Sequence, residues 1–243
     1  MDNKRAVLKP SHIALRERRR KRRRFLIVFM LLIFLIAGIT FASHLRSINV
    51  SIITTEGNKI TSTRDITKLI EKEISGNYLF LISKANTFIF PKNYIEKKLL
   101  VEFPRIEKLW ISRIGFNGLQ VHIVERSGQY LWCGELIDQN TLPTDSSCYF
   151  IDKDGYIFGT APYFSGDAYF KFYGSEDLDL TKSVIGQSLT TSERYTDFIR
   201  MIDGLEKLGI YSQAIKIRSN GEYRVVLTKV DNTHAVNSEI YYS

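Results

Sequence analysis

An uninterrupted apolar run stands out near the N-terminus of the chain. Residues 25–42 (FLIVFMLLIFLIAGITFA) carry no charge, and only Gly38 and Thr40 dilute the apolar pattern. As an α-helix, these 18 residues would extend about 27 Å, close to the hydrocarbon thickness of a bilayer. The pattern predicts a single transmembrane helix.

Basic residues immediately before this run set its predicted orientation. Residues 16–24 read RERRRKRRR, and cations resist transfer through a bilayer, so we expect residues 1–24 to be a cytoplasmic tail and the C-terminal body to be exported. A cleaved signal peptide is the rival interpretation, but its basic region is usually shorter and Thr40-Phe41-Ala42 is a poor cleavage site. A buried core helix is disfavoured because the run is apolar on every side.

The pattern after the membrane run predicts a small α+β domain over residues 43–126. Residues 47–55 alternate and are rich in β-branched side chains, as in a strand. Ser62 and Asp65 resemble a capping box at the start of a helix. The apolar stripe of that helix comprises Ile66, Leu69, Ile70 and Ile74. Residues 78–82 (YLFLI) form a short apolar segment that we expect to be buried, and a second helix is predicted from Pro91 to about residue 101.

A hairpin completes this first domain. Residues 108–116 and 119–125 are two β-prone runs joined by Asn117-Gly118, the preferred sequence of a type I′ turn. The predicted order is therefore strand, helix, helix, strand, strand.

Residues 127–243 predict a second, mainly antiparallel β domain with one long helix, so the fold class is α+β. Strands are expected at 129–133, 148–151, 156–158, 169–173, 214–218 and 223–228, with 239–242 as a candidate last strand. A long apolar stripe predicts the helix over about 192–208, with Thr190 and Glu193 as a capping box and Gly209 after its end.

The excess positive charge of the chain lies in its N-terminal tail. The formal net charge is +8, but residues 1–24 hold 11 Lys or Arg and 2 Asp or Glu, so the rest of the chain is close to neutral. The body therefore lacks the basic surface of a nucleic-acid binder, and we predict no nucleic-acid partner. The tail can contact anionic lipid headgroups, which makes the lipid bilayer a partner.

Candidate chemistry is sparse. None of the four histidines lies in a metal-ligand or nucleophile motif, so we predict no catalytic, metal or cofactor site, no small-molecule substrate and no enzymatic activity. Asp152-x-Asp154-Gly155 lacks the further ligands of an EF-hand and fits a hairpin turn better. Cys133 and Cys148 lie on the exported side, where they are either bonded to each other or two buried free thiols; we expect a disulfide. Trp132 and neighbouring aromatic residues fit a core or an interface better than a sugar-stacking surface.

Several stretches, taken in order, resemble the FtsQ/DivIB family of bacterial cell-division proteins. They are 57–61 (GNKIT), 95–99 (IEKKL), 103–106 (FPRI), 119–126 (LQVHIVER), 130–132 (YLW) and 151–158 (IDKDGYIF). The resemblance covers about residues 20–228 and implies a POTRA domain after the membrane helix, followed by the family's β domain. The residues that carry the motifs, and for which it implies structural roles, are Gly57, Asn58, Pro104, Asn117, Gly118, Glu125, Arg126, Trp132, Asp152 and Gly155.

The resemblance also implies a non-enzymatic scaffold at the division septum. It implies binding of FtsB- and FtsL-like proteins at the membrane-distal end of the β domain, with FtsK, FtsW and FtsI-like proteins as further partners. An uncovered strand there would offer its backbone to a partner. The candidate partner-binding residues are Tyr223, Val225, Leu227, Ile240 and Tyr242. The family usually continues beyond this strand, so the shorter C-terminus here implies either a truncated chain or a rebuilt partner surface.

Two other functions remain open at the level of sequence. A POTRA-bearing protein-export or outer-membrane assembly factor would share the first domain, although it would normally carry tandem POTRA modules or a β-barrel. A membrane-anchored cell-wall enzyme would need a catalytic constellation that the sequence does not display.

Overall fold

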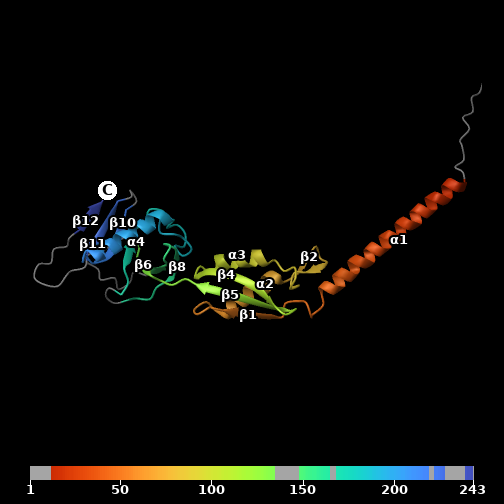
Figure 1. Ribbon diagram of the computed structural model, residues 1–243, viewed down its shortest axis with the longest axis horizontal. Helices are drawn as coiled ribbons and strands as arrows, with labels where there is room; N and C mark the ends of the chain where they lie inside the picture. Colours follow the sequence, from red (N-terminus) through yellow and green to blue (C-terminus); the bar gives the residue numbers. More distant parts are fainter. Residues whose placement is uncertain (1–11, 135–147, 165–167, 219–221, 228–238, 243) are drawn as a thin grey trace, which may run out of the picture.

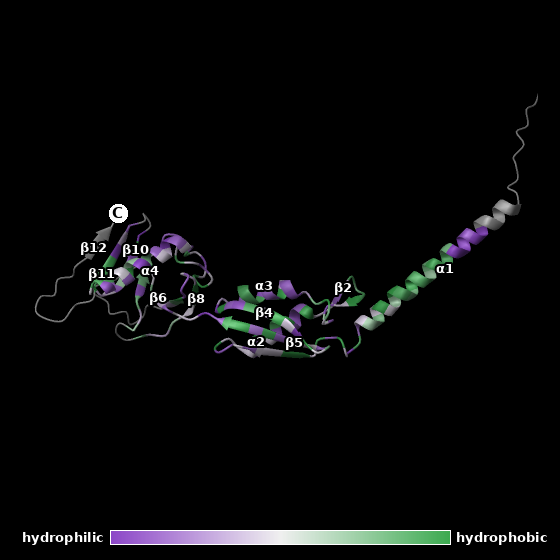
Figure 2. Cartoon of the chain, viewed as in Figure 1, coloured by the Kyte–Doolittle hydropathy of each residue, from purple (hydrophilic) through white to green (hydrophobic). Residues whose placement is uncertain are grey.

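The computed structural model describes residues 12–134, 148–164, 168–218, 222–227 and 239–242. The chain is elongated, with helix α1 (His12–Ser43) at one end, a first domain next to it and a second domain beyond that (Figure 1). Within α1, residues Arg19–Ser43 form a helix that is long and apolar enough to cross a membrane, and its apolar stretch is not buried against the rest of the described chain. Figure 2 shows this apolar stretch in green between the basic segment and the first domain.

The first domain is a three-stranded sheet with two helices packed against it. The sheet has the order β1 (Ile52–Glu56), β5 (Gly118–Glu125), β4 (Ile106–Ile114); β1 is parallel to β5 and β4 is antiparallel to it. The helices are α2 (Thr63–Ile74) and α3 (Lys92–Glu102). One buried cluster joins them to the sheet; it comprises Ile66, Ile70, Ile74, Ile95, Leu99, Ile106, Ile111, Leu119, Val121 and Ile123. The five predicted elements occur in the predicted order, but two short strands that were not predicted, β2 (Asn77–Tyr78) and β3 (Ile82–Ser83), lie between the helices.

Local signals placed α2 correctly but overextended the first strand. Ser62 caps α2 by accepting a hydrogen bond from the Asp65 backbone N–H at 3.4 Å, as predicted. The strand predicted over 47–55 begins only at Ile52. The residues before it pair with a loop instead, since the Val50 N–H donates to the Ala85 carbonyl at 2.8 Å.

The apolar segment at residues 78–82 is not buried, contrary to prediction. It forms the tip of a short hairpin between β2 (Asn77–Tyr78) and β3 (Ile82–Ser83), and the side chains of Leu79 and Phe80 are 87% and 95% exposed. Both residues have positive φ, 47° and 64°, in a three-residue connection that turns their side chains away from the domain.

The hairpin between β4 and β5 is confirmed, but its turn lies earlier than predicted. Ile114 pairs with Gly118, so the turn consists of residues 115–117, and the positive φ of 61° falls on Gly115. Asn117 is instead hydrogen-bonded to Ser51: its carbonyl accepts the Ser51 N–H at 2.9 Å, and its side chain donates to the Ser51 hydroxyl. Pairing with the segment that enters β1 therefore overrides the local Asn-Gly preference.

The second domain contains a seven-stranded mixed sheet in the order β12-β11-β10-β9-β6-β7-β8. The strands are β6 (Tyr130–Trp132), β7 (Tyr149–Ile151), β8 (Ile157–Thr160), β9 (Lys171–Tyr173), β10 (Ser212–Ile217), β11 (Tyr223–Leu227) and β12 (Glu239–Tyr242). β9 runs parallel to both of its neighbours and the other pairings are antiparallel. The described chain is thus α+β, as predicted.

Helix α4 (Ser192–Lys207) packs on this sheet through Tyr195 and Phe198, which join the buried cluster around Phe172 and Ile215. Its N-cap is Thr191, with no side-chain capping bond, so the predicted capping box at Thr190 is wrong. The Thr190 side chain is buried and donates to Asp177 at 3.2 Å.

Candidate interaction sites at the domain junction and the sheet edge

The carboxylate of Glu125, at the end of β5, organises the loop after β1. It accepts hydrogen bonds from the backbone N–H groups of Ile60 at 3.1 Å and Thr61 at 2.7 Å. Asn58 closes the same loop by donating from its side chain to the Thr61 carbonyl at 2.9 Å. Gly57, Asn58 and Glu125, which sequence analysis singled out separately, therefore form one structural unit.

Hydrogen bonding also sets the acidity of Glu125. Partial burial alone would raise the pKa of this carboxyl group, but the hydrogen bonds from Thr61 and Ile60 outweigh that effect and hold the pKa below its usual value. The group is therefore a structural carboxylate at neutral pH.

The next residue, Arg126, links the two domains. Its guanidinium forms an ion pair with Asp152, which precedes the turn into β8, and its Nε donates to the Pro104 carbonyl at 3.2 Å. The same guanidinium lies over the ring of Tyr156, 4.1 Å from the ring centroid. Arginine suits this position because its guanidinium is planar and permanently charged. Its N–H groups can pair with a carboxylate while its flat face stacks on an aromatic ring.

Asp152 holds its own turn as well as Arg126. Its Oδ1 accepts the backbone N–H groups of Asp154 and Tyr156, each at 2.9 Å. Gly155 fits under the ring of Tyr195, where an added Cβ would lie 2.9 Å from the ring, and the Tyr195 hydroxyl donates to the Asp152 carbonyl at 3.1 Å. The turn reading of this motif is confirmed. No group of three potential metal ligands occurs among the residues that the structure describes.

Weaker contacts and a groove border this ion pair. Lys153 reaches Glu107 at 3.2 Å, and the Arg105 guanidinium lies 5.0 Å from the centroid of the Phe158 ring. An open groove of about 480 Å³ runs along the junction, lined by both domains. Two of its charged groups, Glu125 and Arg126, are already held by the contacts above, which leaves them little capacity for a ligand.

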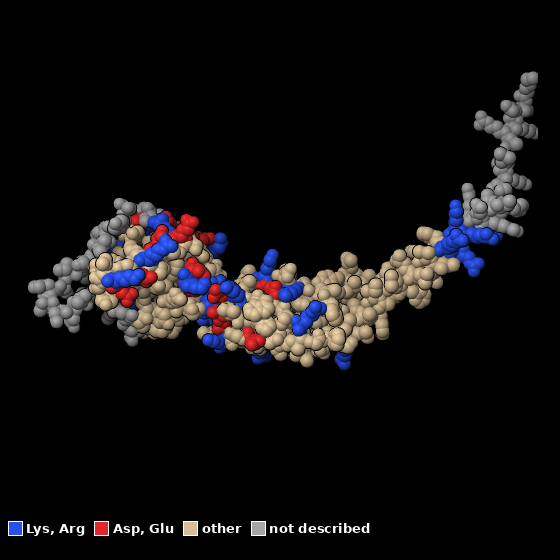
Figure 3. Space-filling view, in the orientation of Figure 1, with Lys and Arg blue, Asp and Glu red and all other residues tan. Residues whose placement is uncertain are grey.

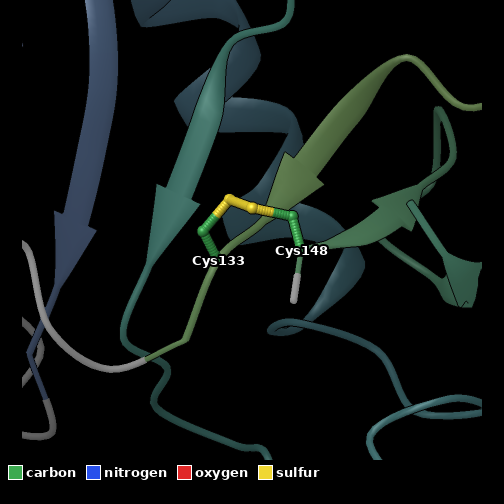
Figure 4. Close-up of a disulfide and its surroundings, with 2 residues drawn as sticks. All are labelled: Cys133 and Cys148. Atoms are coloured by element: carbon green, nitrogen blue, oxygen red, sulfur yellow. A yellow bond between two sulfur atoms is a disulfide. The ribbon is translucent and has the colours of Figure 1, made fainter. Parts of the chain in front are cut away.

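Cys133 and Cys148 form a disulfide beside β6 and β7 (Figure 4), as predicted. Residues 135–147, which it encloses, lie outside the described residues. Trp132 next to it is 5% exposed and donates from its indole N–H to the Gly174 carbonyl at 2.9 Å. Its ring is therefore part of the core and unavailable for stacking on a sugar.

The predicted partner strand is not an edge of the sheet. β11 is hydrogen-bonded to β10 on one side and to β12 on the other, with Val225 opposite Ile240 and Tyr223 opposite Tyr242. The Val225 side chain is 2% exposed and belongs to the core, while Tyr223 and Leu227 are partly buried. β12, with Ile240 and Tyr242, is the outermost strand on this side, and β8 closes the other side. The candidate last strand at 239–242 is therefore confirmed, and it, not 223–228, is the edge strand of the described sheet on this side.

Sequence analysis missed one polar constellation, on the first sheet. The His122 ring lies between Ser112, 3.0 Å from its Nε2, and Glu56, 3.3 Å from its Nδ1, so three adjacent strands place a hydroxyl, an imidazole and a carboxylate in line. Trp110 stacks on the imidazole with ring centroids 4.9 Å apart. An acyl-transfer site would also need N–H donors beside the hydroxyl. The nearby Ile111 N–H is taken by Glu96 at 2.7 Å, and the three side chains are neighbours on adjacent strands.

The described residues thus define a class of protein: an α+β chain in which they form two cores and one N-terminal helix able to cross a membrane. No protein-family model matches the chain, and no curated protein matches it.

Proposed function

We propose that the chain is a single-pass scaffold of the bacterial division machinery, of the FtsQ/DivIB kind. In this proposal α1 spans the cell membrane with its basic tail in the cytoplasm, and both domains lie outside. The protein acts by binding and positioning other division proteins at the septum, and so couples division to septal peptidoglycan synthesis without catalysing a reaction.

The observation that carries the proposal is the order and pairing of the elements next to α1. A strand, two helices and a hairpin occur in this order, with the short β2–β3 hairpin between the helices; β1 lies parallel to β5, and α2 and α3 pack against the sheet through one core. This order matches a POTRA module, and its position directly after α1 matches the FtsQ/DivIB arrangement. The motif residues of that family also support the proposal, since Glu125, Arg126 and Asp152 all have structural partners.

Partner binding in this proposal occurs at the outer edge of β12, the last strand of the described sheet on this side. An outermost strand presents backbone N–H and C=O groups that an extended partner segment can engage by strand addition. Because β12 pairs with β11 over Glu239–Tyr242, its opposite side faces away from the sheet. FtsB- and FtsL-like proteins are the proposed partners, and the edge of the first sheet is a second surface for other division proteins.

Localisation combined with depletion tests the function. A fluorescent protein fused to the N-terminus should form a band at mid-cell, and depletion of the chain should give filamentous cells. Uniform membrane fluorescence with normal division would contradict the division role and favour the alternative, a POTRA-bearing export or assembly factor.

Photocrosslinking tests the binding edge. A photoreactive residue at position 241 in β12 should capture a small division protein in cells. The same residue at Thr160, on the opposite edge strand of the same sheet, is the matched control and should not. Equal crosslinking at both positions would argue against β12 as the partner site.

A further inference from the structure

The end of the first domain that lies next to α1 exposes an unusual number of apolar side chains. Leu79 and Phe80 project from the β2–β3 hairpin and are almost fully exposed. Other exposed apolar residues follow from the adjoining segments: Leu81, Phe88, Ile89, Ile114 and Phe116. Soluble surfaces rarely group so many apolar side chains unless the patch meets a partner or a membrane.

The backbone of the hairpin keeps two of these side chains outward. The Leu81 N–H donates to the Tyr78 carbonyl at 3.0 Å, and both intervening residues have positive φ. This is the φ pattern of a type I′ turn, whose central positions favour Asn and Gly and disfavour large side chains. Leu79 and Phe80 therefore occupy strained positions without burial inside the domain, and a contact outside the domain would account for that choice of residues.

The hairpin is held at the end of the helix that can cross the membrane. The Ser83 N–H donates to the buried Ser43 hydroxyl at the last residue of α1, at 3.4 Å. The connecting segment is tied to the same region, since the Thr87 N–H donates to the Ile48 carbonyl at 2.9 Å. Figures 1 and 2 show the apolar hairpin, labelled β2, beside the end of α1. If α1 spans a bilayer, the tip of the hairpin lies at the outer membrane surface.

The positive charge in this part of the domain is suited to contact with anionic lipid headgroups. Residues 43–55, 76–91 and 113–118 contain the cations Arg46, Lys84 and Arg113 and no Asp or Glu. The Arg113 guanidinium lies 5.1 Å from the centroid of the Phe88 ring. On the face drawn in Figure 3, Asp and Glu do not appear at this end of the first domain. Apolar tips ringed by cations and aromatic rings are typical of membrane–water interfaces.

We propose that the tip formed by Leu79, Phe80 and Leu81 inserts into the outer leaflet of the bilayer, with the surrounding cations on anionic headgroups. This second membrane contact rests on the membrane anchoring in the proposed function. It fixes the first domain at the membrane surface, so the second domain is presented at a set height and direction instead of swinging about the end of α1. Lipid is the occupant because the apolar tip lies beside the end of the apolar surface of α1.

The test uses the full chain in vesicles of phosphatidylcholine and phosphatidylglycerol. A Leu79→Cys variant is labelled with the fluorophore NBD; the native cysteines are bonded to each other and do not react. We expect blue-shifted emission and quenching by doxyl-labelled lipid several-fold stronger than for Val101→Cys. Val101 is the matched control because it is an apolar residue, 80% exposed, near the far end of α3. Equal quenching at the two positions would overturn the proposal.

A second variant removes the apolar tip while keeping the turn. Leu79→Asn combined with Phe80→Gly installs the preferred type I′ sequence, so the fold is retained and a probe at Leu81→Cys should lose most of its lipid quenching. Resistance of the chain to alkaline extraction is measured in parallel. Extraction of the unaltered chain would refute the membrane anchor. If the chain resists extraction but the probe at position 79 is quenched no more than the probe at position 101, only the inserted tip is refuted. Quenching that persists in the double variant would also contradict it.

Discussion

Arg126 and Asp152 join the two domains of the body through an ion pair that is largely withdrawn from water. Their side chains are 16% and 4% exposed, and the guanidinium also reaches the Pro104 carbonyl, while the carboxylate also holds two backbone N–H groups of its own turn. Arg126 directly follows β5 and Glu125, so the residue that leaves the first domain is the one fastened to the second. This relationship limits how the domains move relative to each other.

Removing the cation from this pair should be costly. The change Arg126→Met leaves the Asp152 carboxylate buried without its charged partner, and we expect the free energy of unfolding to fall by about 3 kcal/mol. The measurement is urea unfolding of the full chain in detergent, followed by tryptophan fluorescence. Trp110 lies in the first domain and Trp132 in the second, so both domains report.

Lys153→Met is the matched control at the same junction. The Lys153 side chain is half exposed and pairs with Glu107 and Asp154 near the surface, so its loss should cost much less stability than the loss of Arg126. Equal effects of the two changes would mean that burial of the Arg126 pair contributes nothing to stability.

The Glu125 carboxylate should give stability a defined pH dependence. Because hydrogen bonds lower its pKa in the folded state, Glu125 stabilises the fold at pH values above its usual pKa of 4.5. That contribution is lost as the pH falls through the lower pKa of the folded state. We expect Glu125→Gln to reduce the free energy of unfolding by about 1 kcal/mol at pH 7 and by less at strongly acidic pH, in urea titrations across this range.

Glu102→Gln serves as the control, since Glu102 is an exposed residue at the end of α3. Its stability profile should follow that of the unaltered chain at every pH. A Glu125→Gln profile parallel to the unaltered one would show that the carboxylate charge is not what the loop at Ile60 and Thr61 requires.

Much of the fold follows from local patterns in the sequence. Helical spacing at Ile66, Ile70 and Ile74 identified the buried face of α2, and all three residues are in the core. Local patterns do not show what surrounds a segment in the folded chain. The apolar run at 78–82 reads the same whether it is a buried strand or an exposed hairpin tip, and the positive φ values of Leu79 and Phe80 are visible only in the folded backbone.

The same limit applies to the candidate sites, where local motifs do not show which residues meet. Arg126 and Asp152 each stood in a recognised motif, but 26 positions separate them, and nothing local indicates that they meet. For a similar reason, sequence analysis proposed the strand containing Val225 as the partner strand at the edge of the second sheet. In the structure β12 pairs with that strand and lies outside it. Pairing between distant strands depends on the whole topology, which a single sequence read locally does not specify.

Gly57 should resist replacement because both its conformation and its surroundings require glycine. Its φ is +89°, and an added Cβ would lie 2.1 Å from the Ile123 carbonyl oxygen in the neighbouring strand. We expect Gly57→Ala to lower the free energy of unfolding by about 2 kcal/mol or more, since backbone must move and a disfavoured φ remains. Thermal unfolding of the full chain measures the effect.

Gly204→Ala is the matched control within α4. An added Cβ there meets nothing within 4 Å, and alanine favours a helix interior, so this change should raise stability by about 0.5–1 kcal/mol. Opposite signs for the two substitutions are the expected result. Tolerance of alanine at position 57 would contradict the close approach of the loop to β5.

The disulfide should stabilise the second domain alone. Cys133 and Cys148 are 15 positions apart, and closing a loop of that size is worth about 3 kcal/mol in the chain-entropy model. Replacing both residues with serine should therefore lower the unfolding midpoint reported by Trp132, next to Cys133, while the signal of Trp110 in the first domain changes little. Single-tryptophan variants separate the two signals, and mass spectrometry under non-reducing conditions checks that the exported protein carries the bond. Two alkylatable thiols in the folded, exported protein would contradict the bridge, and an equal shift of both midpoints would show that its effect extends through the junction at Arg126 into the first domain.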